Sequence, residues 1–256
     1  MNGMRFIDRQ DAGLRLVDRL RGRRFERLLV LAIPRGGLEI AAPIARALDG
    51  ELDVVLSRKL RAPMQPELAL GAVSESGDVY LNPQFAGISA AFPQHLEHER
   101  TFQMAEIERR VERFRAVRPK AGIAGRSVII VDDGIATGAT LIAALRTVRA
   151  QAPRELIVAV PVEPEECLSV VRPLCDDLVC LSTPAQFYAV GAHYDSFETV
   201  TDERVVELDG TFAPGRRRAA AADGGAEKRD VASSRRFDDT PALELGTAPT
   251  IVDRSQ

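Results

Sequence analysis

The chain has 256 residues and a formal net charge of −3, with 45% hydrophobic and 28% charged residues, which is ordinary for a globular protein. This mixed charge lacks the basic face that nucleic-acid binding requires, so nucleic acid is not an expected partner. Apolar runs stay shorter than roughly 18 residues, and the N-terminus is too polar for a signal peptide, so a membrane partner is not expected. The three cysteines form no CxxC pair, and together these features predict a cytoplasmic protein.

Strands and helices alternate in the first half of the chain. Leu14, Val17 and Leu20 recur at helical spacing and predict an amphipathic helix over residues 11–20. In order, we then predict a buried strand over 28–33 ending in PRGG, a helix over 38–48 and a second strand over 53–56 that precedes the basic cluster SRK. A Pro-rich stretch leads to two alternating segments, 68–73 and 78–81, which predict a β-hairpin that projects from the sheet.

The second half continues this alternation. Apolar residues recur at helical spacing through the charged segment 94–117 and predict a long helix packed along one face. In order, we then predict a strand over 128–131, a helix over 139–150, a strand over 155–162, a helix over 165–171 and a strand over 178–181. This order predicts an α/β fold with a mostly parallel sheet flanked by helices. One domain is expected over 1–210, with a small hood at about 182–207, and a disordered tail over 211–256.

The segment VIIVDDGIATGAT, residues 128–140, brings two carboxylates and a small-residue turn to the end of a strand. Asp132 and Asp133 can accept hydrogen bonds from vicinal hydroxyls, directly or through a metal ion. Backbone N–H groups at the start of the following helix can hold a phosphate. A ribose 5-phosphate has both groups. The candidate binding residues of the turn are Gly134, Ala136, Thr137, Gly138, Ala139 and Thr140.

At residues 128–140 the chain resembles the type I phosphoribosyltransferases, whose signature for 5-phosphoribosyl 1-pyrophosphate is this strand, acidic pair and loop. The resemblance extends over about residues 5–210 and implies a Rossmann-like fold. It further implies Mg²⁺-dependent transfer of 5-phosphoribose to a nitrogenous base or related small-molecule acceptor, with release of pyrophosphate. Asp132 and Asp133 would bind the ribose diol and the metal, and the turn from Ala136 would hold the 5′-phosphate. Because family members commonly pair, a homodimer is expected.

Two cationic motifs are expected to neutralise the pyrophosphate opposite the acidic pair. Arg35, with the N–H groups of Gly36 and Gly37, is similar to the family's pyrophosphate loop. Arg58 and Lys59 are similar to the pair that adenine phosphoribosyltransferases have after the corresponding strand, and the hairpin that follows is similar to their mobile closing loop. A plain strand-to-helix turn at PRGG and a surface role for the basic pair stay open. The candidate catalytic residues are Arg58, Lys59, Asp132 and Asp133.

Ala136 departs from the hypoxanthine-guanine branch of the family, which has a carboxylate there as the acceptor of the base's proton. Proton transfer would therefore need another group or water. This position and the basic pair resemble the adenine branch, and the acceptor itself stays open.

The hood contains aromatic residues that could stack on a base or form a small satellite core: Phe187, Tyr188, His193, Tyr194 and Phe197. His193 is either a proton shuttle or a structural histidine. Two other functions stay open for the whole chain. One is a non-catalytic sensor of phosphoribosyl pyrophosphate or a nucleotide, and the other is a hydrolase of phosphorylated sugars.

Overall fold

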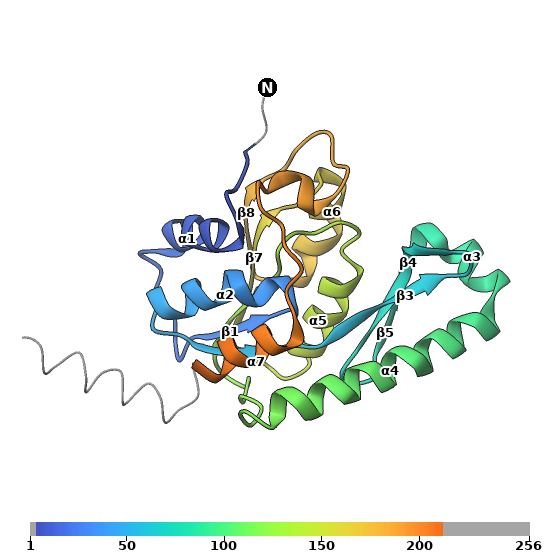
Figure 1. The fold of residues 1–256 in the computed structure, drawn as a ribbon, viewed down its shortest axis with the longest axis horizontal. Helices are drawn as coiled ribbons and strands as arrows, with labels where there is room; N and C mark the ends of the chain where they lie inside the picture. The colour runs from blue at the N-terminus through green and yellow to red at the C-terminus, as the bar shows by residue number, and fades with distance from the viewer. Residues whose placement is uncertain (1–3, 212–256) are drawn as a thin grey trace, which may run out of the picture. The chain divides into compact units, whose positions relative to one another are not determined.

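Five parallel strands form the main sheet in the order β2-β1-β6-β7-β8 in the computed structural model (Figure 1). The strands are β1 (Leu29–Ala32), β2 (Glu51–Val54), β6 (Ser127–Val131), β7 (Glu155–Val162) and β8 (Asp177–Ser182). The predicted α/β class with a mostly parallel sheet is therefore confirmed. The structure describes residues 4–211, so nearly all of the predicted tail lies outside the described residues.

Helices cover both faces of this sheet because alternate residues of each strand enter two separate cores. Val30 and Ile129 face α1 (Arg9–Leu20) and α2 (Gly36–Ala47). Leu31 and Ile130 face the opposite core, formed with α5 (Ala139–Arg149) and α6 (Glu165–Val171). Burial on both faces explains why these strands are continuous apolar runs.

The predicted first helix is confirmed, but one residue of its expected apolar face lies outside the core. Leu16, Val17 and Leu20 are buried, whereas Leu14 is 56% exposed, so the placement of Leu14 was wrong. A Cβ at Gly13 would lie 2.6 Å from Pro43 Cγ. This small residue lets α1 approach α2 closely and sets which side of α1 faces the core.

The projecting element is a three-stranded antiparallel sheet, β3 (Ser57–Ala62), β4 (Gln65–Ser74) and β5 (Val79–Leu81), that extends away from the main sheet (Figure 1). The predicted hairpin corresponds to β4 and β5, and the prediction lacked the third strand, β3. The cluster SRK begins β3, and the Pro-rich stretch contains the β3–β4 turn, where Met64 has φ +64°. Antiparallel pairing with β4 makes this polar segment a strand although it has no alternating apolar pattern.

The predicted long helix is confirmed as α4 (Pro93–Arg115), which packs along β3. It follows the short helices η1 (Pro83–Phe85) and α3 (Ala86–Ala91). Ile107 and Phe114 enter the core, and Glu99 forms an ion pair with Arg61 of β3 at 2.6 Å. These contacts fix the helix against the projecting sheet.

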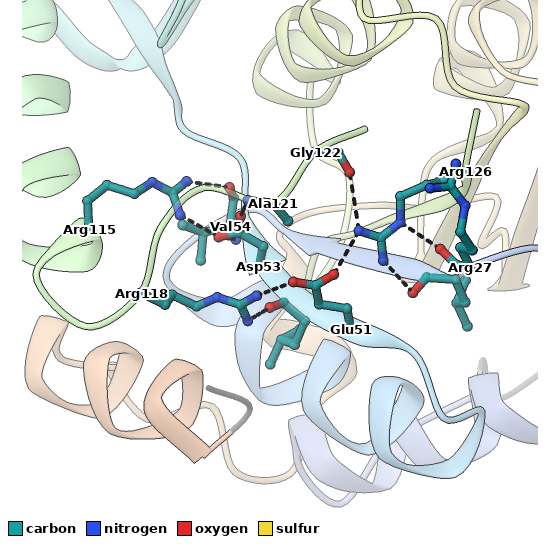
Figure 2. Close-up of polar contacts among 11 residues, drawn as sticks. Arg27, Glu51, Asp53, Val54, Arg115, Arg118, Ala121, Gly122 and Arg126 are labelled. Atoms are coloured by element: carbon teal, nitrogen blue, oxygen red, sulfur yellow. Dashed lines mark hydrogen bonds and ion pairs between the residues drawn. The ribbon is translucent and has the colours of Figure 1, made fainter. Parts of the chain in front are cut away.

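Two acidic residues of β2 attach the connection between α4 and β6 to the edge of the main sheet (Figure 2). Asp53, which is 1% exposed, binds Arg115 at 2.6 Å and the Ala121 N–H at 2.7 Å. Glu51 binds Arg118 at 2.5 Å and Arg126 at 2.7 Å. The pairing of its buried charge explains an Asp between the buried apolar residues Leu52 and Val54.

The hood region contains two helical segments that the sequence patterns did not predict. They are η3 (Val190–His193) and α7 (Asp202–Thr211), and a third short segment, η2 (Arg172–Leu174), precedes β8. Val205 and Leu208 of α7 are buried in the core beside α2. Within residues 4–211, no helix has both the length and the apolar character needed to cross a bilayer.

Candidate functional site

A cleft of about 460 Å³ lies at the carboxyl ends of β1 and β6 and beside the start of β3. Such a position, beyond the carboxyl ends of parallel strands, is where α/β sheets bind ligands. The cleft brings together nine of the predicted residues: Arg35, Gly36, Lys59, Asp132, Asp133, Gly134, Ala136, Gly138 and Thr140. The other four predicted residues, Gly37, Arg58, Thr137 and Ala139, do not line it.

The acidic pair lines the cleft directly after β6. Asp132 Oδ1 accepts a hydrogen bond from the N–H of Asp133 at 2.9 Å. Burial, followed by the negative charge of Asp133, raises the pKa of Asp132 well above its usual value. Burial also raises the pKa of Asp133, against the opposing effect of Arg9. Two adjacent carboxylates that lose water in this way gain strongly from a ligand that donates hydrogen bonds to them.

Arg9 of α1 is a cleft residue that the sequence reasoning missed. Its Nε donates to Asp133 Oδ2 at 2.9 Å, and its Nη1 donates to the main-chain oxygen of Glu198 at 2.8 Å. The guanidinium carbon lies 3.8 Å from the centre of the Phe197 ring. No local pattern marked this residue, because it begins an ordinary amphipathic helix 124 positions before its partner.

The turn from Gly134 to Thr140 leads directly into α5. Gly138 is the N-cap residue with φ +73°, a conformation that glycine adopts without strain. The first N–H groups of a helix have no acceptor within that helix and attract anions. Ser57 Oγ donates to the Thr140 main-chain oxygen at 2.9 Å and Cys167 Sγ donates to that of Ala136 at 3.3 Å, so neighbouring elements hold the turn from both sides.

The two glycines of PRGG have different roles. Gly36 lines the cleft, and a Cβ there would lie 1.8 Å from Asp133 Oδ2. Gly37 donates its N–H to the Ile33 oxygen at 3.2 Å, and a Cβ there would lie 2.6 Å from the Val131 oxygen. Gly37 therefore serves the close packing of α2 on β6, while Arg35 and Gly36 face the cleft.

Arg58 and Lys59 point to opposite sides because they are consecutive residues of a strand. Lys59 lines the cleft, and its positive charge acts on both carboxyl groups of the acidic pair. Arg58 instead donates from Nε to Gln103 of α4. Its pKa is lowered by burial and by the nearby charge of Arg110. Lys59 is thus placed for an anion in the cleft, and Arg58 for contact with the helix.

The acidic pair has few further side-chain ligands for the expected Mg²⁺ among the described residues. These residues contain no group of three or more His, Cys, Asp or Glu side chains arranged to hold a metal. Asp133, one of the two expected ligands, already has Arg9 as an ionic partner at 2.9 Å. Mg²⁺ requires six oxygen ligands in near-octahedral geometry, so the acidic pair alone leaves most positions to water or to a ligand's phosphates.

A second cavity, of about 590 Å³, shares Ala136 and Gly138 with the cleft. Its walls are largely apolar and include Tyr80 and Phe187, with Asn82 among the polar groups. Apolar walls with a few polar groups are typical of pockets for small organic ligands. The turn from Gly134 to Thr140 therefore separates a polar cleft from a less polar cavity.

The hood aromatics divide between the two roles that the sequence left open. Phe187 lines the second cavity and stacks on His193 with a ring separation of 5.5 Å. Tyr194 is 3% exposed, packs on Phe6 and Phe197, and joins Phe6 in the core beneath α1. Phe197 is 38% exposed and lines the cleft. Tyr188 is 85% exposed. Burial and the charge of Arg5 lower the pKa of His193, which favours its neutral form.

Comparisons with known proteins agree with this geometry. Residues 7–196 match the model of a family described as phosphoribosyl transferase domain. Two proteins of Mycobacterium tuberculosis, from strains CDC 1551 / Oshkosh and ATCC 25618 / H37Rv, are each 42% identical to the chain over 204 residues and are named "Putative phosphoribosyl transferase". The alignment covers 78% of this chain and 45% of those proteins, so the chain spans less than half their length. The crystal structure of TT1426 from Thermus thermophilus is 45% identical, with a TM-score of 0.70 over 82% of this chain and 100% of its own.

Proposed function

This chain belongs to the phosphoribosyl transferase domain family, and on that basis we propose that it transfers 5-phosphoribose from 5-phosphoribosyl 1-pyrophosphate to a nitrogenous acceptor and releases pyrophosphate. The observation that supports this most directly is the composition of the cleft. One part presents the acidic pair and the N-terminus of α5, and another presents Arg35 and Lys59. A sugar with vicinal hydroxyls, a 5′-phosphate and a pyrophosphate has one group for each: hydroxyls for the carboxylates, the 5′-phosphate for the helix N-terminus and the pyrophosphate for the two cations.

Each part of the cleft would have a distinct task in this reaction. Asp132 and Asp133 accept hydrogen bonds from the ribose hydroxyls, and the turn before α5 binds the 5′-phosphate through its N–H groups. Arg35 and Lys59 stabilise the negative charge that the pyrophosphate gains when its bond to C1 of the ribose breaks. The carboxylates meanwhile stabilise the positive charge that develops on the sugar. Any Mg²⁺ would be held chiefly by the pyrophosphate.

The second cavity is the proposed acceptor site. It lies across the turn at Ala136 from the cleft, and Phe187 offers a ring face on which a planar acceptor could stack. The carboxylate missing at Ala136 leaves no acidic side chain at that position to take the acceptor's proton. The acceptor's proton would therefore pass to another group, such as Glu166 of this cavity, or to water.

Calorimetric titration with 5-phosphoribosyl 1-pyrophosphate and Mg²⁺, followed by pyrophosphate release with a panel of nucleobases, tests the proposal. We expect binding, release with at least one base, and loss of both in the double variant Asp132→Asn, Asp133→Asn. Binding without release for every base would support the alternative of a sensor. Absence of binding would refute both the transferase and a sensor of phosphoribosyl pyrophosphate, and would leave only a nucleotide sensor. The homodimer and the cytoplasmic location stay predictions, and sedimentation tests the former.

A further inference from the structure

A buried arginine that lies outside the sequence motifs forms an ion pair with one residue of the acidic pair. Arg9 is the first residue of α1, and its side chain is 8% exposed. Nε donates to Asp133 Oδ2, Nη1 donates to the Glu198 oxygen, and Phe197 covers one face of the guanidinium. Glu39 lies 3.9 Å from Nη1. The guanidinium is therefore held on its edge and on its face, unlike a surface arginine.

The charges of the cleft favour a cation at this place. Two adjacent carboxylates that are largely shielded from water repel each other, and each loses hydration energy. An arginine keeps its charge under all ordinary conditions, so Arg9 supplies a permanent positive charge in direct contact with Asp133. A divalent metal ion bound to the two carboxylates could supply the same charge. Asp133 Oδ2, however, already accepts the hydrogen bond from Arg9 Nε.

The surrounding structure is shaped to keep this pair. The side of Gly36 that faces the pair has no room for a side chain, because a Cβ would lie 1.8 Å from Asp133 Oδ2 and 2.8 Å from Arg9 Nε. Tyr194 Oη donates to the Asp133 main-chain oxygen at 2.6 Å. The ion pair is thus enclosed by the PRGG turn and by the segment that follows η3.

We propose that Arg9 is the resident cation of the acidic pair, taking the place at Asp133 that a divalent metal ion would occupy. The free protein then binds no divalent metal at this pair, and a metal enters only when it is bound to an anionic ligand. The entry of a metal together with an anionic ligand rests on the proposed function, whereas the lack of metal binding by the free protein does not. Removal of the Arg9 charge should create a metal site that the natural chain lacks.

Electron paramagnetic resonance of Mn²⁺ without any sugar ligand tests this directly, because protein-bound Mn²⁺ loses the signal of the free hydrated ion. We expect the full chain and Arg9→Lys to bind Mn²⁺ weakly. Arg9→Met should bind it about tenfold more tightly or better, because a unit charge in contact with the site has been removed. Adding Asp133→Asn to Arg9→Met should abolish the gain.

Arg15→Met is the matched control, because Arg15 lies on the same helix and pairs with Asp11 rather than with the cleft. It should leave Mn²⁺ binding unchanged. Arg9→Gln, which is also neutral but can still donate hydrogen bonds, replaces Arg9→Met if the latter does not fold. No gain in whichever of these two variants folds would overturn the proposal. Tight Mn²⁺ binding by the natural chain that disappears in Asp133→Asn would also overturn it, whatever the variants do. Because no sugar ligand is present, these results are independent of the proposed transferase activity.

Discussion

Tyr194 and Asp133 are joined by a hydrogen bond of 2.6 Å from the tyrosine hydroxyl to the aspartate main-chain oxygen. Burial raises the pKa of Tyr194 well above its usual value, so the hydroxyl remains a donor at every ordinary pH. The bond attaches the segment after η3 to the loop that follows β6. The backbone of the acidic pair is therefore positioned by a residue far along the chain.

Tyr194→Phe should lower the free energy of unfolding by about 1–2 kcal/mol, because a buried carbonyl loses its donor. It should also weaken binding of 5-phosphoribosyl 1-pyrophosphate, since Asp133 is held less firmly. Urea denaturation and calorimetry measure the two effects. Tyr188→Phe is the control and should change neither, because Tyr188 is 85% exposed. Equal behaviour of the two variants would contradict a positioning role for Tyr194.

The two aspartates should differ in their contribution to stability. Asp133→Asn leaves the buried Arg9 without its ionic partner and should cost about 3 kcal/mol. Asp132→Asn removes a like charge beside Asp133 and should leave the stability unchanged or raise it near pH 8. Denaturant unfolding of both variants at that pH decides the matter. A larger loss for Asp132→Asn would show that the charge assignment in the cleft is wrong.

The basic pair of β3 should separate into a binding residue and a packing residue. Lys59→Met should weaken 5-phosphoribosyl 1-pyrophosphate binding about tenfold or more, because an ion pair with the pyrophosphate is lost. Arg58→Met should change affinity by less than about threefold, since Arg58 contacts Gln103 of α4. Calorimetric titration of each variant tests this. A stronger effect of Arg58→Met would mean that β3 and α4 rearrange around the ligand.

Gly36→Ala should destabilise the protein by about 2 kcal/mol and weaken ligand binding, because its Cβ would displace the Asp133 carboxylate from Arg9. Gly87→Ala is a matched control in the exposed helix α3, where a Cβ would meet no atom within 4 Å. That substitution should stabilise the protein by about 0.5–1 kcal/mol. Thermal and denaturant unfolding of both variants measure the difference, and loss of stability in neither would contradict the close contact at Gly36.

Glu163 should make stability dependent on pH. Its side chain is fully buried, and burial raises its pKa from 4.5 to about 7 against the opposing effects of the Cys180 thiol and the charge of Arg172. The folded state thus binds an extra proton between pH 4.5 and 7, so this residue's contribution to stability falls as pH rises through that range. The difference between the natural chain and Glu163→Gln should change by up to about 3 kcal/mol over the same range. Parallel curves at all pH values would show that Glu163 does not titrate there.

The sequence by itself determined the alternation of strands and helices, the position of the acidic pair at the end of β6 and the glycine-containing turn before α5. It also identified Arg35, Gly36 and Lys59 as cleft residues. These features depend on short-range patterns, since apolar periodicity, glycine turns and helix starts are properties of neighbouring residues. Parallel strands then bring their carboxyl ends to one edge of the sheet.

Only the tertiary structure decided how the cleft is neutralised and enclosed. Arg9 and Asp133 are 124 residues apart, and Tyr194 lies 61 residues from the same aspartate, so no local pattern relates them. The separation of Arg58 from Lys59 depended on the pairing of β3 with β4, which made their segment a strand with two faces. Contacts between distant segments are set by which surfaces meet when the core is buried, and a local pattern of residue types does not contain that information.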